Sequence, residues 1–140
     1  MNTLQLELIT PERIAFQDSE VLSVTVPSKD GEMGILPHHT ALLAQLTEGE
    51  MKIVKKGEEL FLAIGGGFVE VKNNKVIILV TRAVHSDELN EKEVLEAQKR
   101  AQDVLKSKPG DDTFMEAQNL YRRSLIDMKV LRKRSKRRPS

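Results

Sequence analysis

Two groups of residues are of types that can bind phosphate or a metal ion, but neither has the spacing of a catalytic or metal site. Gly65-Gly66-Gly67 is glycine-rich like a phosphate loop, but it lacks the Gly-Lys-Ser/Thr ending and precedes a strand-like segment instead of a helix. Glycines at a bulge or a tight strand crossing are the better interpretation. His38 and His39 are adjacent, so on an extended segment their side chains point to opposite faces and make a poor chelate.

The other reactive residue types also predict no active site. The chain has no Cys, and its only other histidine is His85. The serines lie outside any Gly-x-Ser-x-Gly setting, and no two carboxylates have a spacing that argues for a general acid and a general base. We therefore expect no catalytic residue, no metal and no cofactor, and we interpret the chain as a binding or mechanical component.

Composition indicates a soluble globular protein. Of the 140 residues, 39% are hydrophobic and 31% are charged. No stretch is apolar enough to span a membrane, and Glu7 interrupts the position where a signal peptide would be apolar. We expect any membrane contact to come through a partner protein.

Charge is divided unevenly along the chain. Residues 121–140 contain nine basic residues and one acid, a net charge of +8, which leaves residues 1–120 with a net charge of −7. Such a basic tail favours an acidic surface of a protein, a nucleic acid or a lipid headgroup, and a solvated terminus without a specific partner is the alternative. Only 4% of the residues are aromatic and Trp is absent, so a surface for stacking nucleic-acid bases is poorly supplied.

Up to about Val84 the hydrophobic pattern predicts strands. Turn signals separate short stretches of alternating apolar residues, a spacing typical of an antiparallel β-sandwich or barrel. One continuous apolar run, Val76–Val80, suits a buried strand. The alternating positions are Leu4, Leu6 and Leu8, then Leu22, Val24 and Val26, then Met51 and Ile53, and finally Leu60, Leu62 and Ile64.

From about Ser86 the period becomes helical. Asn90 can cap a helix with Glu93 three residues later, Pro109-Gly110 ends that helix, and a second helix starts at Thr113. The sequence thus predicts an α+β chain, with an antiparallel β-sandwich in residues 1–85 and an antiparallel two-helix hairpin with a basic tail in residues 86–140. The expected apolar stripes are Val94, Ala97, Ala101, Val104 and Leu105 on the first helix and Ala117, Leu120, Tyr121, Leu125, Met128 and Leu131 on the second.

Two strings, GEMGILPHH at residues 31–39 and GGFVEV at residues 66–71, resemble the epsilon subunits of bacterial F-type ATP synthases. The likeness extends over the whole chain. It implies a sandwich of about ten strands that carries a helical hairpin. It also implies a non-catalytic subunit of the central stalk, which binds the gamma subunit, sits on the ring of c subunits, and couples that ring to the alpha/beta catalytic head. The implied location is the cytoplasmic face of the bacterial cell membrane.

The resemblance also implies roles for particular residues. Glu32 and His39, with Met33 and His38, are implied to face the polar loops of the c ring, since Gly31 and Gly34 allow a tight turn that directs Glu32 and Met33 outward. The hairpin is implied to extend into the catalytic head and inhibit ATP hydrolysis. The candidates for contact with an acidic segment of the catalytic head are Arg122, Arg123, Lys129, Arg132, Lys133 and Arg134.

Some members of this family bind ATP between the two helices, and the matching site here is degenerate. Leu89 is retained, but Asn90, Glu93 and Asp127 stand where the family has aspartate and two arginines, and Arg123 alone keeps the second-helix cation. Anions at two of these places oppose the binding of a triphosphate, so we expect ATP to bind weakly or not at all. The alternative function, a nucleic-acid-binding sandwich with a basic tail, is disfavoured because the sandwich itself is acidic.

Overall fold

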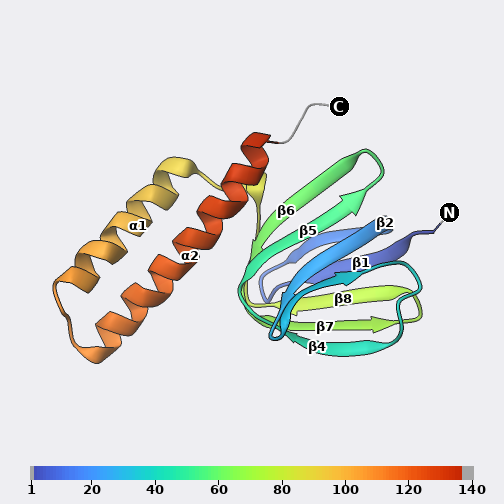
Figure 1. Ribbon diagram of the computed structural model, residues 1–140, viewed down its shortest axis with the longest axis horizontal. Helices are drawn as coiled ribbons and strands as arrows, with labels where there is room; N and C mark the ends of the chain where they lie inside the picture. Colours follow the sequence, from blue (N-terminus) through green and yellow to red (C-terminus); the bar gives the residue numbers. More distant parts are fainter. Residues whose placement is uncertain (1, 137–140) are drawn as a thin grey trace.

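The computed structural model describes residues 2–136, with side chains described as far as Lys133 (Figure 1). The predicted α+β organisation is confirmed, with nine strands among these residues where the family resemblance implied about ten. The strands are β1 Leu4–Ile9, β2 Ile14–Ser28, β3 Gly31–Ile35, β4 Leu42–Leu46, β5 Gly49–Lys55, β6 Glu58–Ile64, β7 Gly67–Lys72, β8 Lys75–Val80 and β9 Ala83–His85. A 3-10 turn, η1 Ser86–Glu88, leads to helices α1 Glu91–Lys106 and α2 Asp111–Lys136.

Strand β2 joins the two layers of the sandwich, because its 15 residues are long enough to pair in both. Its first part pairs with β1, and its second part pairs with β3 and β5. One layer continues from β1 through β8 and β7 to β4, and the other continues from β5 through β6 to β9. The described pairings are antiparallel except that of β1 with β8, which is parallel.

The core forms from the alternating apolar positions, with one departure in β2. Val24 and Val26 are buried as expected, but Leu22 is exposed and Val21 is buried in its place. The register against β5 shifts between Val21 and Ser23. An extra residue of this kind, a β-bulge, moves the preceding side chains to the opposite face of the sheet.

The hairpin begins and turns close to the expected residues. The Asn90 side chain accepts a hydrogen bond from the Glu93 N–H at 3.1 Å and caps α1. Helix α2 begins at Asp111 and not at Thr113. The two carboxylates of Asp111 and Asp112 fall in its first turn, where the helix dipole favours negative charge.

Helix α2 lies between α1 and the sandwich, with α1 on the side away from the sheet (Figure 1). Because α2 packs on two sides, its buried residues do not follow the single predicted stripe. Val130, outside that stripe, is buried with Phe61 and Ala63 of β6. Leu125, which we expected within the stripe, is exposed.

Candidate interaction surfaces

The predicted ring-facing residues lie on β3 and in the loop that follows it. Glu32 lies on β3, which pairs with β2 only among the described strands, and its side chain is exposed. Met33, which we expected to point outward with it, is half-buried and packs against the core. His38 and His39 lie in the loop that follows β3, with His38 exposed and His39 half-buried. Glu32 therefore lies near the β2–β3 turn, and the two histidines lie beyond the other end of β3.

Asn74 fixes the loop that carries the two histidines, and sequence reasoning recognised it only as a turn residue. Its Oδ1 accepts a hydrogen bond from the His38 N–H at 2.8 Å, and its Nδ2 donates to the Thr3 carbonyl at 2.8 Å. His38 has a φ of 63°, a left-handed conformation that is uncommon for a residue other than glycine. Asn74 thus joins the β7–β8 turn, the N-terminal segment and the histidine loop.

An apolar patch lies on the outer face of the layer formed by β4, β7 and β8. Leu43, Phe68 and Leu79, the residues of this outer-face patch, are 70%, 53% and 51% exposed. Phe68 and Leu79 are direct cross-strand partners. We expected the run that contains Leu79 to be a buried strand, and that expectation holds for only one of its faces. An exposed apolar patch of this kind is a candidate surface for contact with another molecule.

Charged side chains join α2 to the sandwich at three points. Arg82, between β8 and β9, donates from both terminal nitrogens to the two oxygens of Asp127 at 3.0 and 2.8 Å. Arg122 lies 3.0 Å from Glu48. The Lys133 ammonium lies 3.6 Å from Glu50 and 5.4 Å from the centroid of the Phe61 ring.

Two of the six cations proposed for the catalytic head, Arg122 and Lys133, are therefore held by the sandwich. Arg123, Lys129 and Arg132 are exposed on α2. The side chain of Arg134 lies outside the described residues. Among the described side chains, Arg122 and Lys133 thus contact carboxylates of the sandwich.

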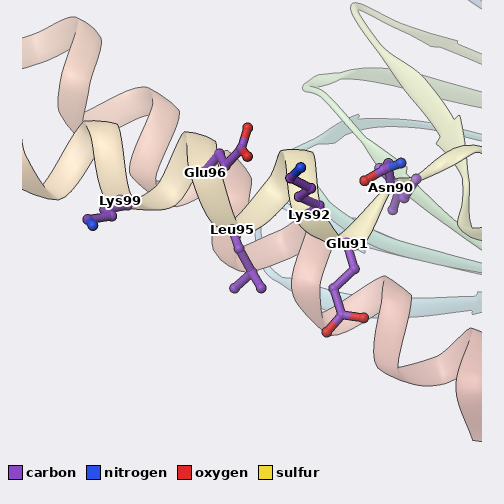
Figure 2. Close-up of a pocket in the computed structure, with 7 residues that line it drawn as sticks. Asn90, Glu91, Lys92, Leu95, Glu96 and Lys99 are labelled. Carbon is purple, nitrogen blue, oxygen red and sulfur yellow. The ribbon is translucent and has the colours of Figure 1, made fainter.

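Two residues of the degenerate nucleotide site, Leu89 and Asn90, line a surface groove. A broad open groove of about 670 Å³ follows the start of α1, lined by Leu89, Asn90, Glu91, Lys92, Leu95, Glu96 and Lys99. Figure 2 shows Glu91 and Leu95 directed to one side of α1 and Glu96 to the other, so the lining does not converge on a ligand. Glu93 is not part of this lining. Asp127, which we expected to face the nucleotide space, forms an ion pair with Arg82 of the sandwich.

Three ionisable groups have pKa values shifted by contacts away from these surfaces. The Lys55 ammonium holds the pKa of Asp18 below its usual range, and Asp18 raises the pKa of Lys55, which ties β5 to β2. The backbone N–H of His85, at 2.9 Å, lowers the pKa of Glu88. Among the described side chains, no group of three or more His, Asp or Glu residues is arranged to hold a metal. No helix in residues 2–136 is both long and apolar enough to cross a bilayer.

The family model for the ATP synthase delta/epsilon chain β-sandwich domain matches residues 3–86. The chain belongs to this family. The ATP synthase epsilon chain of Herpetosiphon aurantiacus is 36% identical over 134 residues, covering 96% of this chain and 98% of that protein. The epsilon chain of Dehalococcoides mccartyi strain CBDB1 is 38% identical over 138 residues, covering 97% of both chains. The family resemblance and the prediction of a non-catalytic subunit are thereby confirmed.

Solved structures share the fold of this epsilon-family chain. A chain in the cryo-EM structure of the Euglena gracilis mitochondrial ATP synthase has a TM-score of 0.69 at 22% identity, covering 94% of this chain and 79% of that one. A chain in the structure of the central stalk and c-ring of the Tetrahymena thermophila mitochondrial ATP synthase has a TM-score of 0.61 at 20% identity. That alignment covers 94% of this chain and 97% of the other.

Proposed function

We propose that the chain is a central-stalk subunit of a proton-translocating ATP synthase, which couples the c ring to the alpha/beta catalytic head. It is a peripheral subunit at the cytoplasmic face of the bacterial membrane, and its membrane contact comes only through the complex. The epsilon-family membership supports the complex, and the outer-face patch supports a permanent protein partner.

The outer-face patch is the proposed contact with the gamma subunit. Leu43 lies on β4 diagonally across from Phe68 on β7, which in turn pairs with Leu79 on β8, so the three form one continuous surface. Fully burying a large apolar side chain contributes about 1.5–3 kcal/mol. Because each of the three is already partly covered in the free chain, together they contribute roughly 3 kcal/mol on burial by a partner. Such central apolar residues dominate the affinity of protein interfaces.

The edge that carries Glu32, His38 and His39 is the proposed contact with the c ring. These residues offer a carboxylate and two imidazoles, groups that suit polar loops better than hydrocarbon. Asn74 and the strained backbone of His38 keep the loop in one conformation, which reduces the entropy lost on binding.

The hairpin is the proposed inhibitor of ATP hydrolysis. Arg123 and Lys129 are exposed on α2 and suit an acidic partner surface. Arg122 and Lys133 become available to the same partner only after they leave Glu48 and Glu50. We make no proposal of nucleic-acid binding, because no observation favours it.

Binding of the purified gamma subunit, measured by titration calorimetry, tests the proposal. We expect Phe68→Asp to weaken binding at least about tenfold, since tenfold corresponds to about 1.4 kcal/mol and the variant places a charge in an apolar contact. Leu125→Asp is the matched control, because Leu125 is a comparably exposed apolar residue on α2 away from the patch. Unchanged affinity of Phe68→Asp, or equal loss in the control, would remove the patch from the interface.

A further inference from the structure

Helix α1 has a face that points away from the rest of the described chain. The helix packs against α2, and the sandwich lies on the far side of α2 (Figure 1). Glu91, Leu95 and Lys99 are exposed and border the groove of about 670 Å³. Glu91 and Leu95 point to the same side of the helix (Figure 2). Because four residues make slightly more than one helical turn, the three form one stripe along α1.

Leu95 is the apolar centre of this stripe. Its side chain is 45% exposed although it is a large aliphatic residue. The charged residues that line the groove around it are two carboxylates, Glu91 and Glu96, and two ammonium groups, Lys92 and Lys99. Their charges cancel, so the groove favours neither a strongly anionic nor a strongly cationic ligand. An apolar centre with a rim of mixed charge suits a protein surface that carries the same groups.

The order of charges along the stripe is self-complementary. Glu91 precedes Leu95 by four residues and Lys99 follows it by four, so each lies about 6 Å along the helix from Leu95. When two copies of α1 lie antiparallel with Leu95 at the twofold axis, Glu91 of each copy is level with Lys99 of the other. A parallel arrangement would place like charges side by side. Among the described residues, neither Glu91 nor Lys99 has an ion-pair partner within its own chain.

We propose that α1 is a self-association surface on which two copies of the chain form an antiparallel, twofold-symmetric dimer. Leu95 of one copy packs on Leu95 of the other, and two equivalent Glu91–Lys99 ion pairs flank this contact. A twofold interface uses the same patch on both copies, the commonest arrangement in homo-oligomers. The two sandwiches lie outside the paired helices, because α2 separates each sandwich from its own α1.

The size of the contact sets the strength of the dimer. One helix face from each copy buries less than about 1,200 Å² in total, which places the contact among the weak and transient ones. The dimer therefore depends on protein concentration. It forms from the chain alone, so its existence is independent of the contacts proposed for the gamma subunit, the c ring and the catalytic head.

Sedimentation velocity of the purified chain, from about 10 μM to about 1 mM, covers the range of weak association and tests the proposal. We expect the sedimentation coefficient to rise with concentration from that of a monomer toward that of a dimer. Leu95→Asp places two carboxylates against each other at the twofold axis and should leave the chain monomeric throughout this range. An unchanged chain that stays monomeric at the highest concentration, or a Leu95→Asp variant that still dimerises, overturns the proposal.

Charge reversal tests the antiparallel pairing. Glu91→Lys and Lys99→Glu each turn both attractive pairs into repulsive ones, so each variant alone should dimerise at least about tenfold more weakly. An equal mixture of the two variants should regain the affinity of the unchanged chain, because each Lys at these positions then faces a Glu of the other copy. This rescue also shows that both variants are folded.

Glu93→Lys is the matched control. It makes the same charge change in the same turn of α1, but Glu93 lies outside the lining of the groove. This variant should dimerise like the unchanged chain. Undiminished association of Glu91→Lys, an equal loss in Glu93→Lys, or a mixture of the two reversed variants that remains monomeric overturns the proposal.

Discussion

Gly67 lies where the backbones of β7 and β8 approach most closely, and it allows a strong test of the fold. A Cβ added there would lie 1.9 Å from the Leu79 carbonyl oxygen and 2.8 Å from the Val80 Cα. Both are backbone atoms and cannot rotate away, so one strand must move by more than about 1 Å in a close-packed sheet. Gly67 pairs with Leu46 as well as with Val80, so this movement disturbs β4 too.

The cost follows from that geometry. Overpacking of a core typically costs about 1–3 kcal/mol and occasionally more. Because the clash at Gly67 is with backbone and also breaks strand pairing, we expect Gly67→Ala to lower the free energy of unfolding by about 3 kcal/mol or more. Gly66→Ala is the matched control. Its nearest contact is the Leu46 carbonyl oxygen at 3.4 Å, so its effect should stay within about 1 kcal/mol.

Urea unfolding followed by circular dichroism measures both variants, since the chain has no Trp and only one Tyr for fluorescence. For a slope of roughly 1–3 kcal/mol per molar urea, a loss of about 3 kcal/mol lowers the midpoint by about 1–3 M. A midpoint for Gly67→Ala that equals that of the unchanged chain, or an equal loss for Gly66→Ala, would refute the close approach as the reason for this glycine.

Three smaller predictions follow from local contacts. Asn74→Gly removes the hydrogen bond from the His38 N–H and should speed hydrogen exchange of that amide by about three- to tenfold, the factor that corresponds to the free energy of one hydrogen bond. Asn73→Gly should leave the exchange rate unchanged, and heteronuclear NMR measures both variants. Glu88→Gln should lower the melting temperature at about pH 6 but not at about pH 3. A carboxyl whose pKa is lowered on folding stabilises the fold fully above its unfolded-state pKa, and this stabilisation is lost as the pH falls through the folded-state pKa. A difference in melting temperature that does not depend on pH would contradict this. Calorimetry with ATP should show no saturable binding, because Asp127 is committed to Arg82, and micromolar affinity would contradict it.

The sequence predicted what depends on local pattern. Alternation gave the strands, and the Asn90 cap and Pro109-Gly110 gave the limits of α1. The displaced register at Val21 was not predictable, because a bulge depends on how β2 meets β5 and not on β2 alone. The exposure of Leu79 was missed for a related reason: an apolar run is equally compatible with a strand buried by its own chain and one covered by a partner.

The charge pattern of the sequence did not predict the ion pairs between the second helix and the sandwich. The net charge of +8 at the C-terminal end and −7 elsewhere predicted an acidic surface of another molecule as the partner of the tail. In the structure, Glu48 and Glu50 of the sandwich contact Arg122 and Lys133 of that same end, and Asp127, its single acid, contacts Arg82 of the sandwich. These residues are separated by 45 or more positions, so only the folded chain brings them together.

This internal pairing changes how strongly an outside surface can attract the hairpin. A partner that binds Arg122 and Lys133 forms two new ion pairs, but it breaks their pairs with Glu48 and Glu50. Partly exposed ion pairs contribute about 0–1 kcal/mol each, so the free energies of the old and new pairs nearly cancel. The net gain must come from exposed cations such as Arg123 and Lys129. The enclosed Arg82–Asp127 contact opposes that gain. An outside partner can therefore bind the hairpin only if it first contacts the exposed cations and also supplies Asp127 with a cation in place of Arg82.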